Sequence, residues 1–145
     1  MLERQQFVAA ATVTANARAH DVWAIWSDVG AWANWDQSLD RTEYRGAFRS
    51  GARFVVVPHG GEAVEARLRT VTPDVEFSDE MALPFGVIRR SHRVEQLGVR
   101  VKITHELQAD IETRAAPFFA KEVWPHMQIG LPVSLNNLVG LVEPH

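Results

Sequence analysis

The chain has 145 residues, of which 46% are hydrophobic and 23% are charged, and its net charge is -3. These values are typical of a globular protein and predict one domain over residues 1–145. The weak negative charge excludes a general polyanion-binding role, because nucleic-acid phosphates require clustered Lys and Arg side chains. The chain has no cysteine. Disulfides, thiolate zinc sites and cysteine nucleophiles are therefore excluded, and a reducing compartment is favoured.

No run of about 18 apolar residues occurs, so the sequence predicts no membrane span. The first residues, MLERQQF, include an acidic side chain and lack the apolar core of a secretory signal. We therefore expect a cytoplasmic protein.

The N-terminal segments predict a strand followed by two short helices. Residues 6–14 are β-branched or small, as expected of a strand. Residues 19–28 have apolar side chains at helical spacing, at Val22, Trp23, Ile25 and Trp26. After a glycine break, residues 31–35 predict a second helix, in which Trp32 and Trp35 share a face because they are three residues apart.

From Leu39 onward the hydrophobic pattern alternates, as it does in half-buried antiparallel strands. The predicted strands are residues 39–45, 52–58, 62–72, 75–81, 86–96 and 98–109, with the last two turning near Leu97-Gly98. An amphipathic stripe then predicts a long helix over 117–143. Pro125 and Pro132 lie inside it, so we expect one or two kinks or breaks. The element order predicts an α+β fold in which this helix covers a curved antiparallel sheet.

The hairpin of 86–96 and 98–109 has three polar side chains on its otherwise apolar face. Successive strand residues point to opposite faces, so parity decides which residues share a side. On one strand the inward positions include Arg90 and His92, and on the other they include His105. The inner face is therefore predicted to gather these three side chains.

The same turn also predicts the pairing of charges on the outer face. A two-residue or a four-residue loop near 96–98 keeps the inner face together, and in the two-residue version Glu95 lies opposite Arg100 and Arg89 opposite Glu106. Opposite charges at directly facing positions are favourable.

The preceding hairpin, with a turn at Pro73-Asp74, adds a carboxylate to the inner face. Parity groups Asp79 with the inward residues Ala66, Leu68, Thr70, Phe77 and Met81. Asp79 is then within reach of Arg90 on the neighbouring strand. A buried arginine without an acidic partner is very costly, so the two are predicted to pair.

Two interpretations of this polar cluster are open. In the structural interpretation, Asp79 and Arg90 form a buried ion pair and the histidines bond to backbone or water. In the functional interpretation, the cluster lines a ligand pocket. Its catalytic version has His92 or His105 abstract a proton beside a substrate carbonyl, while Arg90, oriented by Asp79, stabilises the developing enolate.

The sequence offers little sign of a cofactor. No dinucleotide, phosphate-loop, zinc-protease or serine-hydrolase motif occurs. His92 and His105 have no evident third metal ligand beyond Asp79, so we expect no metal site. His126 follows Pro125 in the long helix and is a weaker candidate for facing the cavity.

The chain resembles the START-like, or SRPBCC, superfamily and within it the bacterial polyketide cyclase/dehydrase-like group. The resemblance covers nearly the whole length and depends on the order and spacing of several segments. These are VWAIWSD (22–28) with WANW (32–35), GAFRSG (46–51), VTPDVEFSDE (71–80), the SHRVE and GVRVKITHEL segments (91–107), and GLPVSLNNLVGLVE (130–143).

The resemblance implies the helix-grip fold: a curved antiparallel sheet of about seven strands, two short helices and a long C-terminal helix, enclosing a hydrophobic cavity. It also implies binding of a hydrophobic or aromatic small molecule, such as a lipid, polyketide or related metabolite, with no metal or nucleotide cofactor. Some members catalyse cyclisation, aromatisation or dehydration with a few polar cavity residues. The candidate ligand-binding side chains are Trp23, Trp26, Trp35, Phe77, Met81, Val101, Ile103 and Met127.

Two other functions are left open. One alternative is a non-catalytic ligand carrier or sensor. The other is an interaction module like those of the co-chaperone and toxin–antitoxin branches of the superfamily. The expected partner of the leading hypothesis is a hydrophobic small molecule, and the sequence does not distinguish a monomer from a homodimer.

Overall fold

The computed structural model describes residues 3–144. The elements in chain order are β1 (Arg4–Ala15), α1 (Ala19–Trp26), the 3₁₀ helix η1 (Val29–Asn34), β2 (Leu39–Glu43), β3 (Arg53–Pro58), β4 (Val64–Thr72), β5 (Glu76–Leu83), β6 (Gly86–Leu97), β7 (Arg100–Glu112), α2 (Ala116–Phe118), the π-helix η2 (Phe119–Val123) and α3 (Trp124–Val142). The predicted strand and helix order is confirmed.

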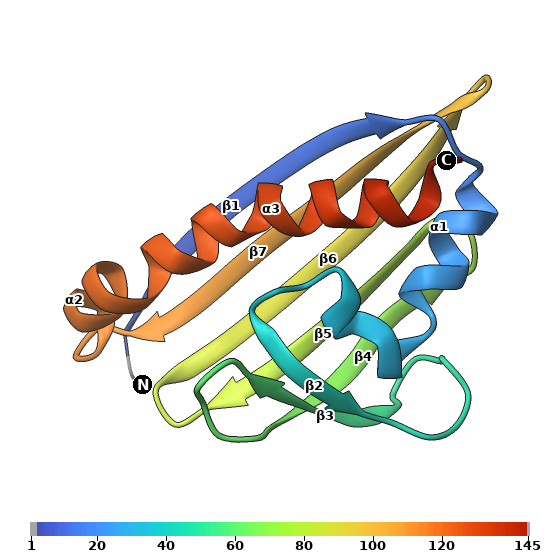
Figure 1. Ribbon diagram of the computed structural model, residues 1–145. Helices are drawn as coiled ribbons and strands as arrows, with labels where there is room; N and C mark the ends of the chain where they lie inside the picture. The colour runs from blue at the N-terminus through green and yellow to red at the C-terminus, as the bar shows by residue number, and fades with distance from the viewer. Residues whose placement is uncertain (1–2, 145) are drawn as a thin grey trace.

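The strands form one seven-stranded antiparallel sheet in the order β1-β7-β6-β5-β4-β3-β2. Strands β3 to β7 are joined to their neighbours by connections of two to five residues, and residues 44–52 join β2 to β3. β1 lies at the opposite edge from β2, so α1 and η1 carry the chain across one end of the sheet (Figure 1). The sheet curls, and α3 lies across its concave face (Figure 1). This arrangement is the predicted helix-grip fold.

The β6–β7 hairpin places His92 directly opposite His105, as the inner-face prediction requires. Its turn is formed by Gly98 and Val99, one residue later than predicted, with Gly98 in the left-handed conformation that glycine adopts easily (φ 62°). The later turn shifts the register by two residues and leaves the inward and outward faces unchanged.

The predicted charge pairs on the outer face of this hairpin are wrong as a consequence of that shift. Glu95 lies opposite Lys102 rather than Arg100. Arg89 lies opposite Gln108 rather than Glu106, and it instead contacts Glu80 and Asp110 on the strands beside it.

A β-bulge in β4 alters the preceding hairpin. The register is irregular between Leu68 and Val71, and the turn contains three residues, 73–75, rather than two. An extra residue in one strand shifts the faces beyond it. Thr70 is therefore exposed, against prediction, while Leu68 remains directly opposite Asp79 inside the sheet.

The C-terminal helical segment passes from α2 through the π-helical turn η2 into α3 and is not broken. The π-helical segment η2 precedes Pro125, which occupies the first turn of α3. Pro132 lies inside α3, which continues through it. The expected disruption thus occurs before the first proline and not at the second.

Two groups of buried side chains form the core beneath α3. The first joins the tryptophans of α1, η1 and the residue after η1 to β2–β7 and to Leu135 and Leu138 of α3. The second joins Phe7, Phe119, Trp124 and Leu131 to the adjacent ends of β6 and β7. The two groups support opposite ends of the helix, and the space between them is described below.

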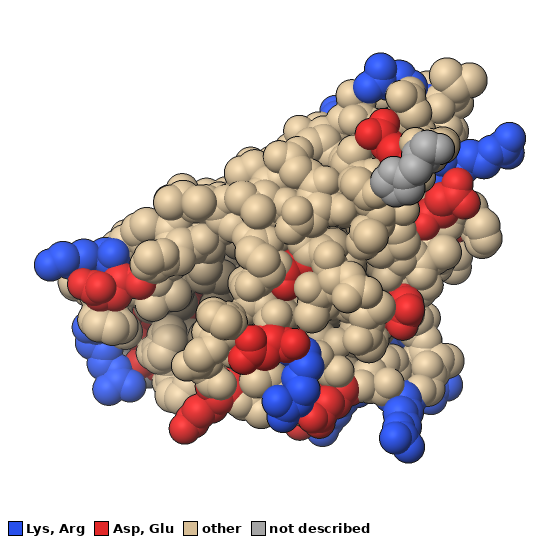
Figure 2. All heavy atoms as spheres, viewed as in Figure 1, with Lys and Arg blue, Asp and Glu red and all other residues tan. Residues whose placement is uncertain are grey.

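Charged side chains are sparse on the face that α3 presents to solvent. Helix α3 contains no Asp, Glu, Lys or Arg, and in Figure 2 most charged atoms lie around the rim of this view. Ile129 and Val133 are exposed on the helix. Among residues 3–144, no helix combines the length and apolarity needed to cross a membrane.

Candidate functional site

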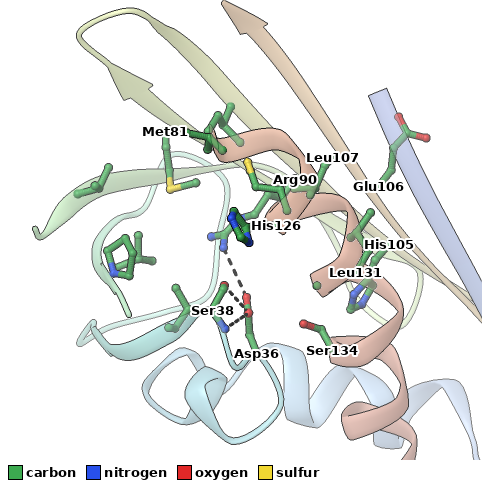
Figure 3. Close-up of a pocket in the computed structure, with 18 of the residues that line it drawn as sticks. Asp36, Ser38, Met81, Arg90, His105, Glu106, Leu107, His126, Leu131 and Ser134 are labelled. Carbon is green, nitrogen blue, oxygen red and sulfur yellow. Dashed lines mark hydrogen bonds and ion pairs between the residues drawn. The ribbon is translucent and has the colours of Figure 1, made fainter. Parts of the chain in front are cut away.

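A cavity of about 300 Å³ lies between the sheet and the N-terminal half of α3. Its walls are mainly apolar and come from both core groups, with Leu39 and Val56 on one side and Ile88, Leu107 and Leu131 on the other. The polar lining side chains are Asp36, Ser38, Arg90, His92, His105, His126 and Ser134. Glu106 also borders the space, but its side chain points away from it (Figure 3).

The structure separates the predicted site residues into two sets. Those that line the cavity are Trp35, Met81, Arg90, His92, His105 and Met127. Those that are not among its lining residues and are buried in the core are Trp23, Trp26, Phe77, Asp79, Val101 and Ile103. His126 lines the cavity although its side chain is also exposed.

Arg90 forms a two-bond ion pair with Asp79, which lies directly opposite it on β5. The Nε and Nη2 atoms of Arg90 donate to the two carboxylate oxygens of Asp79 at 2.8 and 2.9 Å. The Asp79 side chain is fully buried and that of Arg90 is 12% exposed. Parallel hydrogen bonds of this kind fix the orientation of the guanidinium as well as its position.

A second carboxylate faces the same guanidinium. Asp36 follows η1, and its Oδ2 atom is 4.0 Å from Nη1 of Arg90. The other oxygen of Asp36 accepts hydrogen bonds from the backbone N–H and the hydroxyl of Ser38, at 3.0 and 2.5 Å. The Arg90 guanidinium also lies 5.5 Å from the ring centre of Trp32, a favourable position for a cation.

Burial and charge act in opposite directions on this ion pair. Burial raises the pKa of Asp79, and the Arg90 guanidinium opposes that increase. Burial alone lowers the pKa of Arg90, but Asp79 and Asp36 more than offset it, so the net change is an increase. Arg90 therefore carries its charge at neutral pH between two acidic groups.

The two histidines are part of a continuous aromatic cluster. The ring of His92 stacks on Phe77 with centroids 4.0 Å apart, and His105 lies edge-on to His92 at 4.6 Å. Trp26 and Trp35 contact both imidazole rings, with ring centroids 5.6–6.2 Å apart. Nδ1 of His92 is 3.4 Å from the backbone oxygen of Phe77. Within residues 3–144, the buried Nε2 atom of His105 and the Nε1 atoms of Trp26 and Trp35 have no hydrogen-bond partner.

Both histidines are neutral at physiological pH. Burial lowers the pKa of His105 to about 3, with a further contribution from the positive charge of Arg90. Burial also lowers the pKa of His92 well below its ordinary value, and His105 and Arg90 add to the effect. A base with so low a pKa removes protons weakly.

Hydrogen bonds connect α3 to the loop that carries Asp36. The hydroxyl of Ser134 donates to the side-chain oxygen of Gln37 at 3.2 Å. The amide of Asn137 donates to the backbone oxygen of Trp35 at 3.3 Å. The helix and the loop that close the cavity are therefore linked to each other.

The family model described as polyketide cyclase/dehydrase and lipid transport matches residues 6–143. The chain belongs to this family. No curated protein sequence matches the chain significantly.

Solved structures share the fold of this chain. Truncated norcoclaurine synthase from Thalictrum flavum is 17% identical with a TM-score of 0.75, over 100% of this chain and 98% of that one. A hypothetical protein from Helicobacter pylori is 18% identical with a TM-score of 0.76, over 94% and 88% of the two chains. The di-domain ARO/CYC StfQ from the steffimycin biosynthetic pathway is 9% identical with a TM-score of 0.75, over 94% of this chain and 50% of that one.

Three residues that line the cavity were not predicted from the sequence: Asp36, Ser38 and Ser134. Asp36 and Ser38 have a local signal, because an Asp side chain that bonds two residues ahead is a common turn former. That signal predicts the turn but not its proximity to Arg90. Ser134 lies on the long helix, where its inward position depends on how the helix is rotated.

The donor set of the cavity does not resemble a metal site. In the part of the chain that the structure describes, no three His, Cys, Asp or Glu side chains are grouped closely enough to hold a metal ion. The polar groups instead offer hydrogen-bond donors and acceptors at one end of an apolar space. This arrangement is suited to orienting an apolar molecule that carries few polar atoms.

Proposed function

We propose that this protein binds a hydrophobic small molecule in the cavity beneath α3. The observation that carries the proposal is a space of about 300 Å³ with mainly apolar walls and few inward polar groups. Sites for small molecules usually have this form. Membership of a family whose description includes lipid transport supports it, as does a fold shared with norcoclaurine synthase and an ARO/CYC protein.

The proposal is limited to binding. Catalysis by His92 or His105 stays a separate prediction, and the low pKa of His105, about 3, argues against its use as a base near pH 7. Their rings contribute to the packed aromatic cluster beside the cavity. This packing supports the structural interpretation of the two histidines.

The test is a titration with 2-methylnaphthalene, an apolar bicyclic probe, followed by tryptophan fluorescence. Trp35 lines the cavity, so an occupant there changes its surroundings. We expect a saturable change in the parent protein. Val64→Phe adds bulk to a lining position and is expected to weaken binding at least tenfold.

Val133→Phe is the matched control, because Val133 is exposed on the outer side of α3. It makes the same replacement outside the cavity and is expected to leave the affinity unchanged. The proposal is wrong if the parent shows no saturable change, or if both variants bind the probe as the parent does.

A further inference from the structure

The guanidinium of Arg90 has unused donors at the cavity. An arginine has five N–H donors, and two are bonded to Asp79, which leaves three. Within residues 3–144, Nη1 makes no hydrogen bond. Asp36 is 4.0 Å away from it, which is too long for one. Because the Arg90 side chain is only 12% exposed, these donors have little access to bulk solvent.

Asp36 provides the complementary acceptor across this gap. Its Oδ1 atom is occupied by the two bonds from Ser38, while Oδ2 faces Nη1 of Arg90 (Figure 3). Both side chains line the cavity. Asp79 fixes the guanidinium and Ser38 fixes the carboxylate, so the 4.0 Å separation is set by bonds on both sides.

One oxygen atom fits between the two groups. A separation of 4.0 Å is less than twice a hydrogen-bond length of about 2.8 Å, so an oxygen beside the line joining Nη1 and Oδ2 reaches both. That oxygen must accept from Arg90 and donate to Asp36. A hydroxyl group does both, whereas an ether or ketone oxygen only accepts.

We propose that the cavity binds a neutral, otherwise apolar ligand through one hydroxyl group bridging Arg90 Nη1 and Asp36 Oδ2. This inference rests on the proposed function and specifies its ligand class. The bridge is made with two charged partners, and such hydrogen bonds are stronger than those between neutral groups.

The charges at this end of the cavity exclude a carboxylate ligand. Arg90 already faces two acidic side chains, Asp79 and Asp36, so its positive charge is compensated before any ligand binds. A ligand carboxylate placed there would be repelled by Asp36 and would have no proton to donate to it. The cavity is therefore predicted to reject fatty acids and to accept alcohols and phenols of matching size.

The test compares three probes with the same bicyclic skeleton at pH 7, using the fluorescence titration above. They are 2-naphthol, 2-methylnaphthalene and 2-naphthoate. We expect 2-naphthol to bind about tenfold more tightly than 2-methylnaphthalene, as one charge-assisted hydrogen bond provides. We expect 2-naphthoate to bind most weakly.

Asp36→Asn removes the acceptor charge with little change of shape. It is expected to reduce the advantage of 2-naphthol below about threefold and to tighten the binding of 2-naphthoate, because less negative charge then faces Arg90. Asp40→Asn is the matched control, since Asp40 is exposed and pairs with His59 on the surface. It is expected to keep the parent order of affinities.

The outcomes separate this inference from the proposed function. Equal affinity for 2-naphthol and 2-methylnaphthalene overturns the hydroxyl bridge and leaves the hydrophobic site in place. Tightest binding of 2-naphthoate by the parent also overturns it. Absence of saturable binding by all three probes overturns both. The ratio measured on the parent decides the inference even if Asp36→Asn does not fold.

Discussion

Arg90 is the residue on which the polar end of the cavity depends. Its burial is tolerable only because Asp79 accepts two of its N–H groups and Asp36 lies nearby. Burying either partner alone leaves an uncompensated charge in a poorly solvated site. The pair therefore fixes the direction of the remaining donors more than it stabilises the fold.

Removing the charge of Asp79 is predicted to be strongly destabilising. Asp79→Asn leaves Arg90 beside an uncharged amide, and we expect a loss of about 3–5 kcal/mol in the free energy of unfolding, measured with urea. Glu80→Gln is the control on the same strand: it breaks the partly exposed pair with Arg89 and is expected to cost at most about 1 kcal/mol. Equal losses in the two variants would contradict this account of Arg90.

The buried histidines predict a loss of stability in acid. In the unfolded chain a histidine binds a proton near pH 6.5, but the pKa of folded His105 is about 3 and that of His92 is also well lowered. Between these values the unfolded state binds more protons. Stability is therefore complete above about pH 6.5 and falls as pH decreases toward 3, by about 1.4 kcal/mol per pH unit for His105, with a further loss in the same direction from His92. The raised pKa of Asp79 offsets part of this loss.

Urea unfolding between pH 7 and pH 4 measures the effect. His105→Phe keeps an aromatic ring in the cluster. It is expected to remove the part of the change in unfolding free energy with pH that His105 contributes. His20→Gln changes an exposed histidine that pairs with Asp74 and is expected to leave the slope as it is. Equal slopes in the parent and in His105→Phe would show that folded His105 takes up its proton at the ordinary pH, which would contradict this account.

Strand parity predicted the inward face well, because successive residues of a strand point to opposite faces of the sheet. Arg90, His92 and His105 were grouped correctly, and Asp79 was paired with its true partner. Asp36 was missed because it lies in a turn after η1, where no periodicity relates it to the sheet. Its distance from Arg90 depends on how the connection from β1 to β2 crosses the molecule.

At the scale of elements, the β6–β7 pairing has one position that requires glycine. A Cβ at Gly86 would lie 2.2 Å from the backbone oxygen of Asp110, and backbone on the adjacent strand cannot move aside as a flexible side chain can. Gly86→Ala is therefore predicted to reduce the unfolding free energy by about 3 kcal/mol, at the upper end of overpacking costs.

Gly140→Ala is the contrasting change in α3. A Cβ there meets nothing within 4 Å, and alanine favours a helix over glycine by up to about 1 kcal/mol. We expect this variant to be more stable than the parent in urea. If Gly86→Ala leaves the unfolding midpoint at or above that of the parent, the close approach of Gly86 to β7 is not a constraint in solution.

The local departures from the predicted elements have a common origin. Each departure adds one or two residues to an element or shifts its register by one or two residues. The departures are the bulge in β4, the later turn of the β6–β7 hairpin and the π-helical segment η2. Hydrophobic periodicity is nearly unchanged by such shifts when the faces beyond them still match. These features are set by contacts between elements, and the sequence pattern of one element does not contain them.

At the scale of the whole molecule, the cavity is a consequence of how two core groups support one helix. The tryptophan cluster packs beneath the C-terminal half of α3, and the group around Phe119 and Trp124 packs beneath its start. Between them the sheet curves away from the helix, and the lining side chains do not fill the gap. The fold class and the covering helix were predictable from element order, but the size of this gap was not.

The central claim is that a ligand occupies this gap, and the methionine methyl groups test it most directly. The chain has three methionines, and two of them, Met81 and Met127, line the cavity from opposite sides, on β5 and α3. In protein with ¹³C-labelled methionine methyls, we predict nuclear Overhauser contacts from 2-naphthol ring protons to both Met81 and Met127. Saturable binding of 2-naphthol without contacts to either methyl would place the ligand elsewhere and contradict the account.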